Sequence, residues 1–556
     1  MVRIVGTLLI LAMAISLAFA QQSASPLDST KLIQSKLQQV GELWQQGDYS
    51  KAIPILEELR TYPKVQEMDW AWQAVLYYLA CGYSLLGQKE KAVNFLREAV
   101  EAGYGDFKHM ESDTDLDNIR ATEGYKQIAE VAKRRESFWE NSFINTPYKE
   151  NLSEDEKVAG LSKLWSEIKY NFVYFERVPE VNWDSLYMAF LPKARQTQST
   201  LEYYRTLQEM CAHLKDGHTG VNWPPALYDQ VYGRPPIQTR LVEDHVLITK
   251  VSDDSLPETG IRPGLEILRI DDVPVKDYAN SRIAPFAKAS TPQGHAEQLY
   301  SYQLLAGAKD SPVELELQDS KGKILTRTVR RTPSKEGVPV PDMEFKMLTG
   351  NIAYIAVNTF SNESIVAQFD SLFPFIEQAN AVILDIRENG GGNSSIGFRL
   401  LGYLTADSFR IERWATREYR PYHRAQGRPE RWHEEPHDLW PPQGSKHFGK
   451  AVAVLISART GSAAEDFCVA FDVMNRGPLI GEPTCGSTGQ PLIFSLPGGG
   501  NAFVCTAHCF YPDGKEFVGV GVLPDIEVHP TVKDVRAEKD PVLNAAIDWL
   551  KNKRGK

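Results

Sequence analysis

The chain has 556 residues, a formal net charge of −11, 42% apolar residues and 24% charged residues. These totals are ordinary for a soluble globular protein, and at roughly 150 residues per domain the length predicts three to four domains. The acidic balance argues against nucleic acid or an anionic membrane as the main partner.

The N-terminus has the pattern of a secretory signal. Arg3 precedes the apolar stretch "IVGTLLILAMAISL", and Ala18-Phe-Ala20 forms an A-x-A-like cleavage site before Gln21. The alternative is a membrane anchor, but the apolar stretch is shorter than the roughly 20 residues that a span needs. We therefore expect residues 1–20 to be a signal peptide, with no span after its removal. The mature protein would be exported, to a periplasm, a cell envelope or the medium.

Residues 28–140 are predicted to be helical and repetitive. The segments "LWQQGDYSKAIPILEEL" (43–59) and "YSLLGQKEKAVNFLREAV" (83–100) share a turn glycine, an alanine and apolar residues at helical spacing. This pattern resembles tetratricopeptide helical hairpins, which implies stacked helix pairs and a surface for a protein partner. The alternative is a plain helical bundle without a ligand.

Residues 150–225 continue with helices. Ser153-x-x-Glu156 is a capping-box pattern that opens the helical run "VAGLSKLWSEIKYNF". The segment ends in "MCAHLKDGHTGV" (210–221), a helix that runs into a glycine-containing turn. A lone histidine is more often structural, but the Gly-His-Thr-Gly setting makes burial in a core less expected. It leaves the imidazole of His218 free to act as a base.

The sequence pattern changes from helical to strand-like in residues 232–333. "IQTRLVEDHVLITKV" (237–251) predicts two strands around a polar turn, and "TGIRPGLEILRIDDVPV" (259–275) follows. The run "GIRPGLEILRIDDVPV" resembles part of a PDZ domain. Such domains bind an extended peptide at a sheet edge and capture its terminal carboxylate with backbone N–H groups. The loop 233–236 would be the capture loop.

Residues 345–535 have an α/β pattern. The strands predicted here are "IAYIAVNTF", "AVILDI", "AVAVLIS" and "PLIGE", with helices between them and hairpin-like runs after them. The Trp-, Arg- and Pro-rich excursion 408–448 is assigned to no element. The tail, 536–556, is predicted to contain a helix.

The stretch "RTGSAAEDF" (459–467) stands between one of these strands and a helix. Ser462 and Glu465 match a capping box, so Ser462 has a purely structural explanation. The same geometry would expose a serine beside a helix N-terminus, whose N–H groups can stabilise an oxyanion. That arrangement suits an acyl-transfer nucleophile.

The stretch "LDIRENGGGNSS" (384–395) follows another predicted strand. Three consecutive glycines allow positive φ and a close approach to a ligand. A phosphate loop is disfavoured, because G-x-x-x-x-G-K-[ST] is absent. A simple turn and half of an oxyanion hole remain as alternatives.

Two other patterns suggest a metal. "HEEPH" (433–437) matches H-E-x-x-H, but that motif needs one continuous helix, and Pro436 disfavours it. Cys505, His508 and Cys509 lie in a strand-like run without a fourth ligand nearby. We expect no metal and no organic cofactor.

Taken in order, "KDGHT", "ILDIRENGGG", "RTGSAAEDF", "IGEPTCGSTGQP" and "DGKEFVGVGVLPDIEV" resemble the tail-specific (C-terminal processing) serine proteases and their tricorn-core relatives. The likeness covers roughly residues 150–535. It implies that Ser462 is the nucleophile. It also implies that the N–H group of Ala463, with that of Gly390 or Gly391, forms the oxyanion hole.

This chain differs from the family pattern at the position of the general base. The Ser/Lys branch carries T-x-G-K, but here the lysine position holds Ser487, so the tricorn-like branch, with histidine as base, fits better. That branch points to His218. The glutamate that would hold it falls on Val518, and Glu516, on the same face of a strand, is the expected substitute.

The predicted fold is a multidomain α+β protein with N-terminal helical repeats and a PDZ-like domain, and the family resemblance implies a helical cap segment and a crotonase-like α/β protease core. The predicted function is that of an exported serine endopeptidase that acts on polypeptides through Ser462, His218 and Glu516. The alternative is a catalytically silent scaffold that binds peptides through its tetratricopeptide-like and PDZ-like parts.

Overall fold

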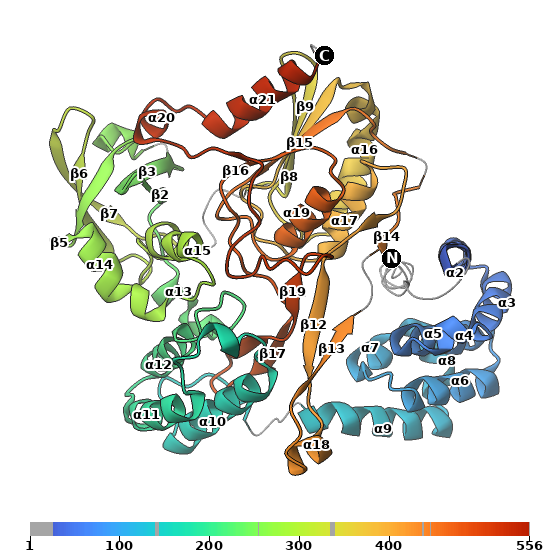
Figure 1. Ribbon diagram of the computed structural model, residues 1–556. Coiled ribbons are helices and arrows are strands. Elements are labelled where there is room, and N and C mark those ends of the chain that lie inside the picture. Colours follow the sequence, from blue (N-terminus) through green and yellow to red (C-terminus); the bar gives the residue numbers. More distant parts are fainter. Residues whose placement is uncertain are drawn as a thin grey trace. The chain divides into compact units, whose positions relative to one another are not determined.

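The computed structural model describes residues 26–139, 144–253, 255–333, 340–435, 439–444 and 446–554. They form two units, and each is described by itself (Figure 1). The first comprises residues 1–142 and 436–441, and the second comprises residues 143–435 and 442–556. The predicted signal peptide, residues 1–20, lies outside the described residues. Within the described ranges, no helix combines the length and the apolar character that a bilayer span requires.

The first unit contains two helical hairpins with the same turn. Helices α2 (Pro26–Gln45) and α3 (Tyr49–Arg60) form one, and α5 (Asp69–Leu85) and α6 (Lys89–Glu101) form the other. Gly47 and Gly87 both have a φ of +74°, which favours glycine at the end of a helix. The other helices are α4 (Pro63–Gln66), α7 (Phe107–Ser112), η2 (Thr114–Leu116), α8 (Asp117–Arg120) and α9 (Glu123–Trp139).

These hairpins share one apolar core. Leu37, Leu56, Leu76 and Leu96, one from each helix of the two hairpins, are fully buried in it. The helical character predicted for this region is confirmed. Its kinship with tetratricopeptide units stays a prediction.

The second unit opens with three helices, α10 (Glu154–Asn171), α11 (Trp183–Gln196) and α12 (Thr200–Ala212). The predicted capping box is present. Ser153 N–H donates to Glu156 Oε2 at 2.9 Å, and Glu156 N–H donates to Ser153 Oγ at 3.3 Å. After α12 the chain turns at Lys215, whose φ is +48°, and enters the short strand β1 (Gly220–Asn222). His218 therefore lies between a helix end and a strand.

An antiparallel sheet follows, and we call residues 232–333 the antiparallel segment. Its strand order is β2-β3-β4-β6-β7, with β5 paired to β4. Its core is a separate apolar cluster that includes Ile248, Ile267 and Leu315. The strands are β2 (Ile237–Val242), β3 (His245–Val251), β4 (Glu266–Ile270), β5 (Val273–Pro274), β6 (Pro312–Gln318) and β7 (Ile324–Arg330). The helices are α14 (Val275–Arg282), η6 (Ala284–Phe286), α15 (Pro292–Glu297) and η7 (Gln298–Tyr302), and the connection before the segment holds η4 (Pro225–Leu227) and α13 (Tyr228–Val231).

The α/β core is built on a second sheet, with strand order β20-β16-β15-β10-β9-β8. All neighbours are parallel except β8, which is antiparallel to β9. The strands are β8 (Met343–Leu348), β9 (Ile352–Val357), β10 (Ala381–Asp385), β15 (Ala451–Ile456), β16 (Leu479–Gly481) and β20 (Ile526–Glu527). The strands predicted from the four apolar runs are confirmed.

Helices cover both faces of this sheet (Figure 1). On one face, Ile383 and Leu455 pack in a cluster with Val542, Ala546 and Leu550 of α21 (Pro541–Arg554), the helix predicted in the tail. Residues between them, such as Leu384 and Val454, point to the opposite face because side chains alternate along a strand. That side holds α16 (Ser364–Gln378), α17 (Ser394–Gly402) and α19 (Ala463–Val473).

The segment 408–448, for which the sequence predicted no element, contains β11 (Phe409–Arg410), β12 (Arg413–Glu418), α18 (Pro421–Ala425), β13 (Arg431–Glu435) and β14 (Leu439–Trp440). Strands β12 and β13 form a long hairpin with α18 at its tip (Figure 1). The first part of "HEEPH" thus lies in a strand, and the second part lies outside the described residues.

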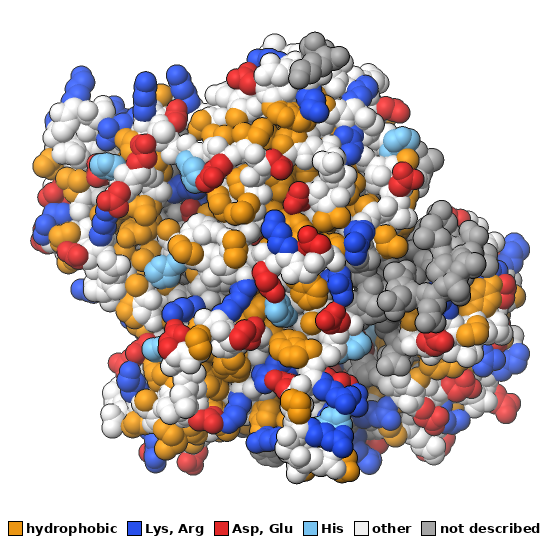
Figure 2. Space-filling model, in the orientation of Figure 1, with side chains coloured by type: hydrophobic (Ala, Val, Ile, Leu, Met, Phe, Trp, Pro, Cys, Tyr) orange, Lys and Arg blue, Asp and Glu red, His pale blue; other side chains and the backbone are white. Residues whose placement is uncertain are grey.

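Acidic and basic side chains are interspersed over the face of the molecule in Figure 2.

The remaining elements of the second unit are η3 (Phe175–Arg177), η5 (Pro257–Thr259), β17 (Pro491–Ser495), β18 (Asn501–Cys505), β19 (His508–Phe510) and α20 (Val532–Arg536). Strands β1, β18 and β17 form a small antiparallel sheet, which ties the His218 region to the core. All six cysteines are free thiols.

Candidate active site

The core sheet brings two loops to one edge. Strands β10 and β15 are parallel neighbours, so their carboxyl ends meet at the same edge of the sheet, where α/β folds bind their ligands. The glycine loop follows β10, and the loop with Ser462 follows β15. Asn389 joins them, because its carbonyl accepts from Gly461 N–H at 3.1 Å.

Ser462 occupies a strained position at the start of α19. Its φ of 56° and ψ of −131° are rare for a residue with a side chain. Its N–H group donates to Glu465 Oε2 at 3.2 Å, while its Oγ lies 3.0 Å from Nε2 of His218. The structural explanation and the catalytic one are therefore compatible, since the backbone is capped and the hydroxyl faces an imidazole.

His218 contacts two serines. Its Nε2 atom faces Ser462, and its Nδ1 atom lies 2.7 Å from Ser487 Oγ. Burial lowers the pKa of His218 below its usual value. The carboxylate of Asp216 opposes this effect, and the ammonium group of Lys288 adds to it. A lowered pKa keeps the imidazole neutral near pH 7, as a general base requires.

A buried carboxylate holds the loop that carries Ser487. Glu465 is fully buried, and it accepts hydrogen bonds from the N–H groups of Gly486 at 2.6 Å and Ser487 at 2.8 Å. The hydroxyl of Thr484 donates to it at 2.5 Å. Burial raises the pKa of Glu465 to about 7, although these hydrogen bonds act in the opposite direction. The same residue therefore fixes both Ser462 and the serine behind His218.

The three expected oxyanion residues are not equivalent. Gly391 donates its N–H to Asn389 Oδ1 at 2.9 Å, so this donor is already used. Among the described groups, none accepts from the N–H of Gly390 or Ala463. A Cβ atom at Gly391 would lie 2.6 Å from Ser462 Cβ and 3.0 Å from Ala463 N. Gly391 thus permits the close approach of the two loops, and Gly390 and Ala463 keep unused donors.

Glu516 does not take the place expected for it. Its carboxylate accepts from His508 Nε2 at 2.8 Å and lies 3.7 Å from Arg177. The expectation relied on strand alternation, but Glu516 makes only an isolated bridge to Phe510. The position beside Nδ1 of His218 belongs to Ser487 instead. The replacement of lysine by serine in "TCGS" was the sequence signal that could have found it.

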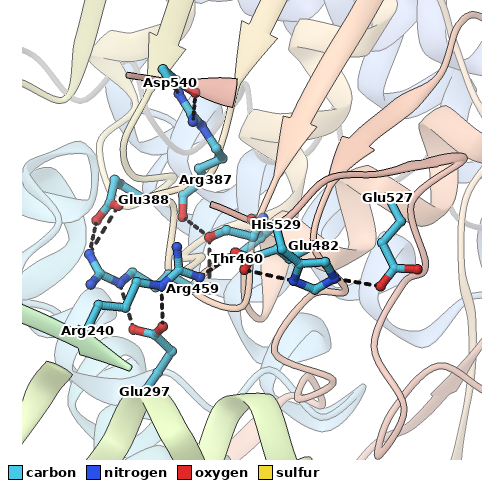
Figure 3. A network of polar contacts seen from close by, with 11 residues as sticks. Arg240, Glu297, Arg387, Glu388, Arg459, Thr460, Glu482, Glu527, His529 and Asp540 are labelled. Atoms are coloured by element: carbon cyan, nitrogen blue, oxygen red, sulfur yellow. Dashed lines mark hydrogen bonds and ion pairs between the residues drawn. The ribbon is translucent and has the colours of Figure 1, made fainter. Parts of the chain in front are cut away.

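A network of ion pairs joins the antiparallel segment to the loops of the site (Figure 3). Arg459 donates to Glu297 of α15 at 2.8 Å and to Glu388 of the glycine loop at 2.9 Å. Arg240 of β2 contacts Glu297 at 3.2 Å and also Glu482, which follows β16. Burial alone would raise the pKa of Glu297, but the two guanidinium groups lower it.

Helix α15 also contacts the loop 484–487 directly. Gln293 Nε2 donates to Thr484 O at 2.9 Å, and Thr291 Oγ1 donates to Cys485 O at 2.7 Å. These contacts could not be seen in the sequence, because they join segments about 200 residues apart. Over the described ranges, no cluster of three or more His, Cys, Asp or Glu residues could hold a metal ion.

The chain is similar to known peptidases in sequence. Residues 351–528 match the model of peptidase family S41. A "Carboxyl-terminal-processing protease" of Synechocystis sp. is 21% identical over 451 residues, which is 76% of this chain and 95% of that protein. The "C-terminal processing peptidase, chloroplastic" of Tetradesmus obliquus is 24% identical over 292 residues, 52% of this chain and 58% of that protein.

The fold is also shared with a solved structure. The crystal structure of mature CPAF superposes with a TM-score of 0.57 at 15% identity, over 72% of this chain and 96% of that one. Residues 351–528 thus match peptidase family S41, and the chain is a serine peptidase similar to the carboxyl-terminal processing proteases.

Proposed function

We propose that this protein is an exported serine endopeptidase in which Ser462 is the nucleophile and His218 is the general base. The observation that carries this assignment is the 3.0 Å separation of Ser462 Oγ and His218 Nε2. It lies within the range for direct proton transfer. The strained backbone of Ser462 and the helix N-terminus beside it support the same role.

The chemistry follows from the contacts. His218 Nε2 takes the proton of Ser462 as Oγ bonds to the scissile carbonyl carbon. The N–H groups of Gly390 and Ala463 donate to the resulting oxyanion. The imidazolium then returns the proton to the leaving amine as the C–N bond breaks. Water, activated by the same imidazole, hydrolyses the acyl-enzyme and regenerates Ser462.

Ser487 acts as a positioning residue in this scheme. For Nε2 to accept a proton, Nδ1 must carry the other one, and Ser487 Oγ is the acceptor that favours this tautomer. A serine places no charge beside the imidazolium. Asp216 compensates in part, because its carboxylate raises the pKa of His218 against the effect of burial.

The antiparallel segment would engage the peptide in the manner of a PDZ domain. Strands β2 and β7 are the edge strands of its main strand order, and an extended peptide can add to such an edge. The proposed capture loop, residues 233–236, is partly tied down, since Arg234 N–H donates to Thr332 O at 3.0 Å. We also propose that residues 1–20 direct export of the protein. The helical first unit would bind a protein partner.

The test is the hydrolysis of a long unstructured polypeptide by the chain that starts at residue 21. Mass spectrometry should find internal cleavage products, and Ser462→Ala should lower their rate of formation by ~10³-fold or more. Ser371→Ala, at an exposed position on α16, is the matched control and should leave the rate unchanged. Equal rates for the parent and Ser462→Ala would refute the assignment. A silent scaffold, the alternative function, would bind the polypeptide without cutting it.

A further inference from the structure

The two edges of the core sheet differ in length. At one edge, β20 has only two residues, Ile526–Glu527. At the other edge, β8 has six residues, Met343–Leu348, and among the described strands it pairs only with β9. A strand of this length presents a row of backbone N–H and C=O groups on its outer side, and these groups can pair with another strand. The active-site chemistry described above uses neither edge.

Apolar side chains are exposed along the β8 edge. Met347 of β8 is 44% exposed, and Phe375 of the neighbouring helix α16 is 59% exposed. The rings of Phe345 and Phe375 lie 6.4 Å apart between centroids, so Phe345 points to the face of the sheet that carries α16. Met343 and Met347 point to the same face, because side chains alternate along a strand. Exposed apolar side chains beside an unpaired strand are typical of an interaction surface.

The opposite face of β8 carries two opposite charges. Glu344 Oε2 and Lys346 Nζ lie 3.2 Å apart, and both side chains remain partly exposed. Leu348, on the same face, packs in the cluster that α21 covers. A lone lysine at a sheet edge discourages pairing between copies of the strand, but a glutamate two residues away can offset its charge. The ion pair within the strand is exposed and therefore weak, so it can be exchanged for ion pairs between strands.

These charges select one register for the pairing of two copies of β8. A two-fold axis perpendicular to the sheet makes the strands antiparallel and sets one residue opposite its own copy. An axis at Glu344 or at Lys346 would set two like charges opposite each other, which is destabilising. An axis at Phe345 sets Glu344 opposite Lys346 of the second copy, and this happens twice by symmetry. It also sets Met343 opposite Met347 of the second copy, whereas an axis at either methionine would pair fewer residues of the strand.

We propose that β8 pairs with β8 of a second copy of this chain, in the antiparallel register centred on Phe345. The core sheets of the two copies then continue into each other. The edge is complementary to itself in charge, and its apolar side chains meet apolar side chains of the second copy. A second copy is therefore the partner that this edge fits. The inference goes beyond the proposed peptidase function and does not depend on it, because no catalytic residue lies on β8.

Sedimentation velocity of the chain that starts at residue 21 tests the association. We expect a two-chain species whose share grows with concentration and which dominates at ~100 µM. A one-chain species alone up to this concentration overturns the proposal. In that case the charges of β8 would serve only to keep its edge from pairing.

Charge reversal tests the surface and the register together. Lys346→Glu places two acidic side chains opposite each other, and Glu344→Lys places two basic ones opposite each other. Each variant should therefore associate ~10-fold or more weakly than the parent. Lys321→Glu is the matched control, because it makes the same charge change at an exposed lysine outside β8. This control should associate like the parent, and circular dichroism checks the fold of every variant.

A mixture of the two β8 variants gives the sharpest result. In a mixed pair, both acidic side chains of the Lys346→Glu chain stand opposite basic side chains of the Glu344→Lys chain. An equimolar mixture should therefore recover an affinity within a few-fold of the parent. Failure of the mixture to associate more tightly than either variant alone overturns the register. Association that neither single variant weakens shows that the two chains meet through another surface, and the assignment to β8 then fails.

Discussion

His218 Nδ1 lies 2.7 Å from Oγ of Ser487, so a neutral hydroxyl stands where catalytic histidines of serine proteases commonly meet a carboxylate. We expect Ser487→Ala to lower kcat by ~10- to 100-fold, because the imidazole loses the contact that favours the productive tautomer. KM should change little, since Ser487 touches no substrate in our scheme. Steady-state kinetics measure both values, and an unchanged kcat would remove Ser487 from the mechanism.

His218→Ala tests the base itself. The variant should lose peptidase activity by ~10³-fold or more, because no other described group contacts Ser462 Oγ through a hydrogen bond. His245→Ala, at a histidine on β3 that pairs with Glu266, is the matched control and should keep the parent rate. A fall confined to less than about tenfold would point to another base.

The pH profile reports the charges around His218. Its pKa is lowered, mainly by burial, so the acid limb of kcat/KM should have its midpoint below 6.5. Lys288→Gln removes a cation that lowers this pKa, so the limb should move to higher pH. A parent midpoint above 6.5, or a shift to lower pH in the variant, would contradict the assignment of the base.

Gly391 is expected to tolerate no side chain. Its φ is +102°, and a Cβ atom would lie 2.6 Å from Ser462 Cβ. Gly391→Ala should therefore displace Ser462 and slow peptide cleavage by ~100-fold or more. Gly449→Ala is the control, because no atom lies within 4 Å of its Cβ position and its φ is not positive. Equal rates of peptide cleavage for the two variants would show that the glycine loop and the Ser462 loop can move apart without loss of activity.

Arg459 should stabilise the site through its two carboxylates. Arg459→Met leaves Glu297, whose side chain is only 6% exposed, with one cation fewer. We expect a cost of about 3 kcal/mol. The urea concentration that halves activity should then fall by about 1 M. Arg399→Met, which breaks a pair with the 59% exposed Glu363, should shift it far less.

Much of the fold could be predicted because local patterns determine it. The apolar runs at 381–386 and 451–457 became the adjacent strands β10 and β15, and Ser153 and Glu156 formed the expected cap. The excursion 408–448 could not be assigned, because its two hairpin strands, "RWATRE" and "RWHEE", do not alternate polar with apolar residues. Among the described strands, its second strand, β13, pairs only with β12 and lies at the edge of its sheet.

Only the site residues that stand in a recognisable sequence motif could be predicted. Ser462 and His218 stand in recognisable stretches, but the pairing of His218 with Ser487 joins residues 269 positions apart. Glu516 was chosen by strand alternation, which fails for a residue held by a single bridge. Lys288 stands in no motif at all, and only the packing of the antiparallel segment against β1 reveals its place.

In the proposed mechanism, His218 activates Ser462 as the nucleophile. Its most direct test is labelling of the folded protein with a fluorophosphonate, followed by mass-spectrometric mapping of the modified residue. The structure predicts one adduct per chain, on Ser462, and a labelling rate that falls by ~10³-fold or more in His218→Ala. An adduct on a different residue, or full-rate labelling of Ser462 in His218→Ala, would contradict the claim.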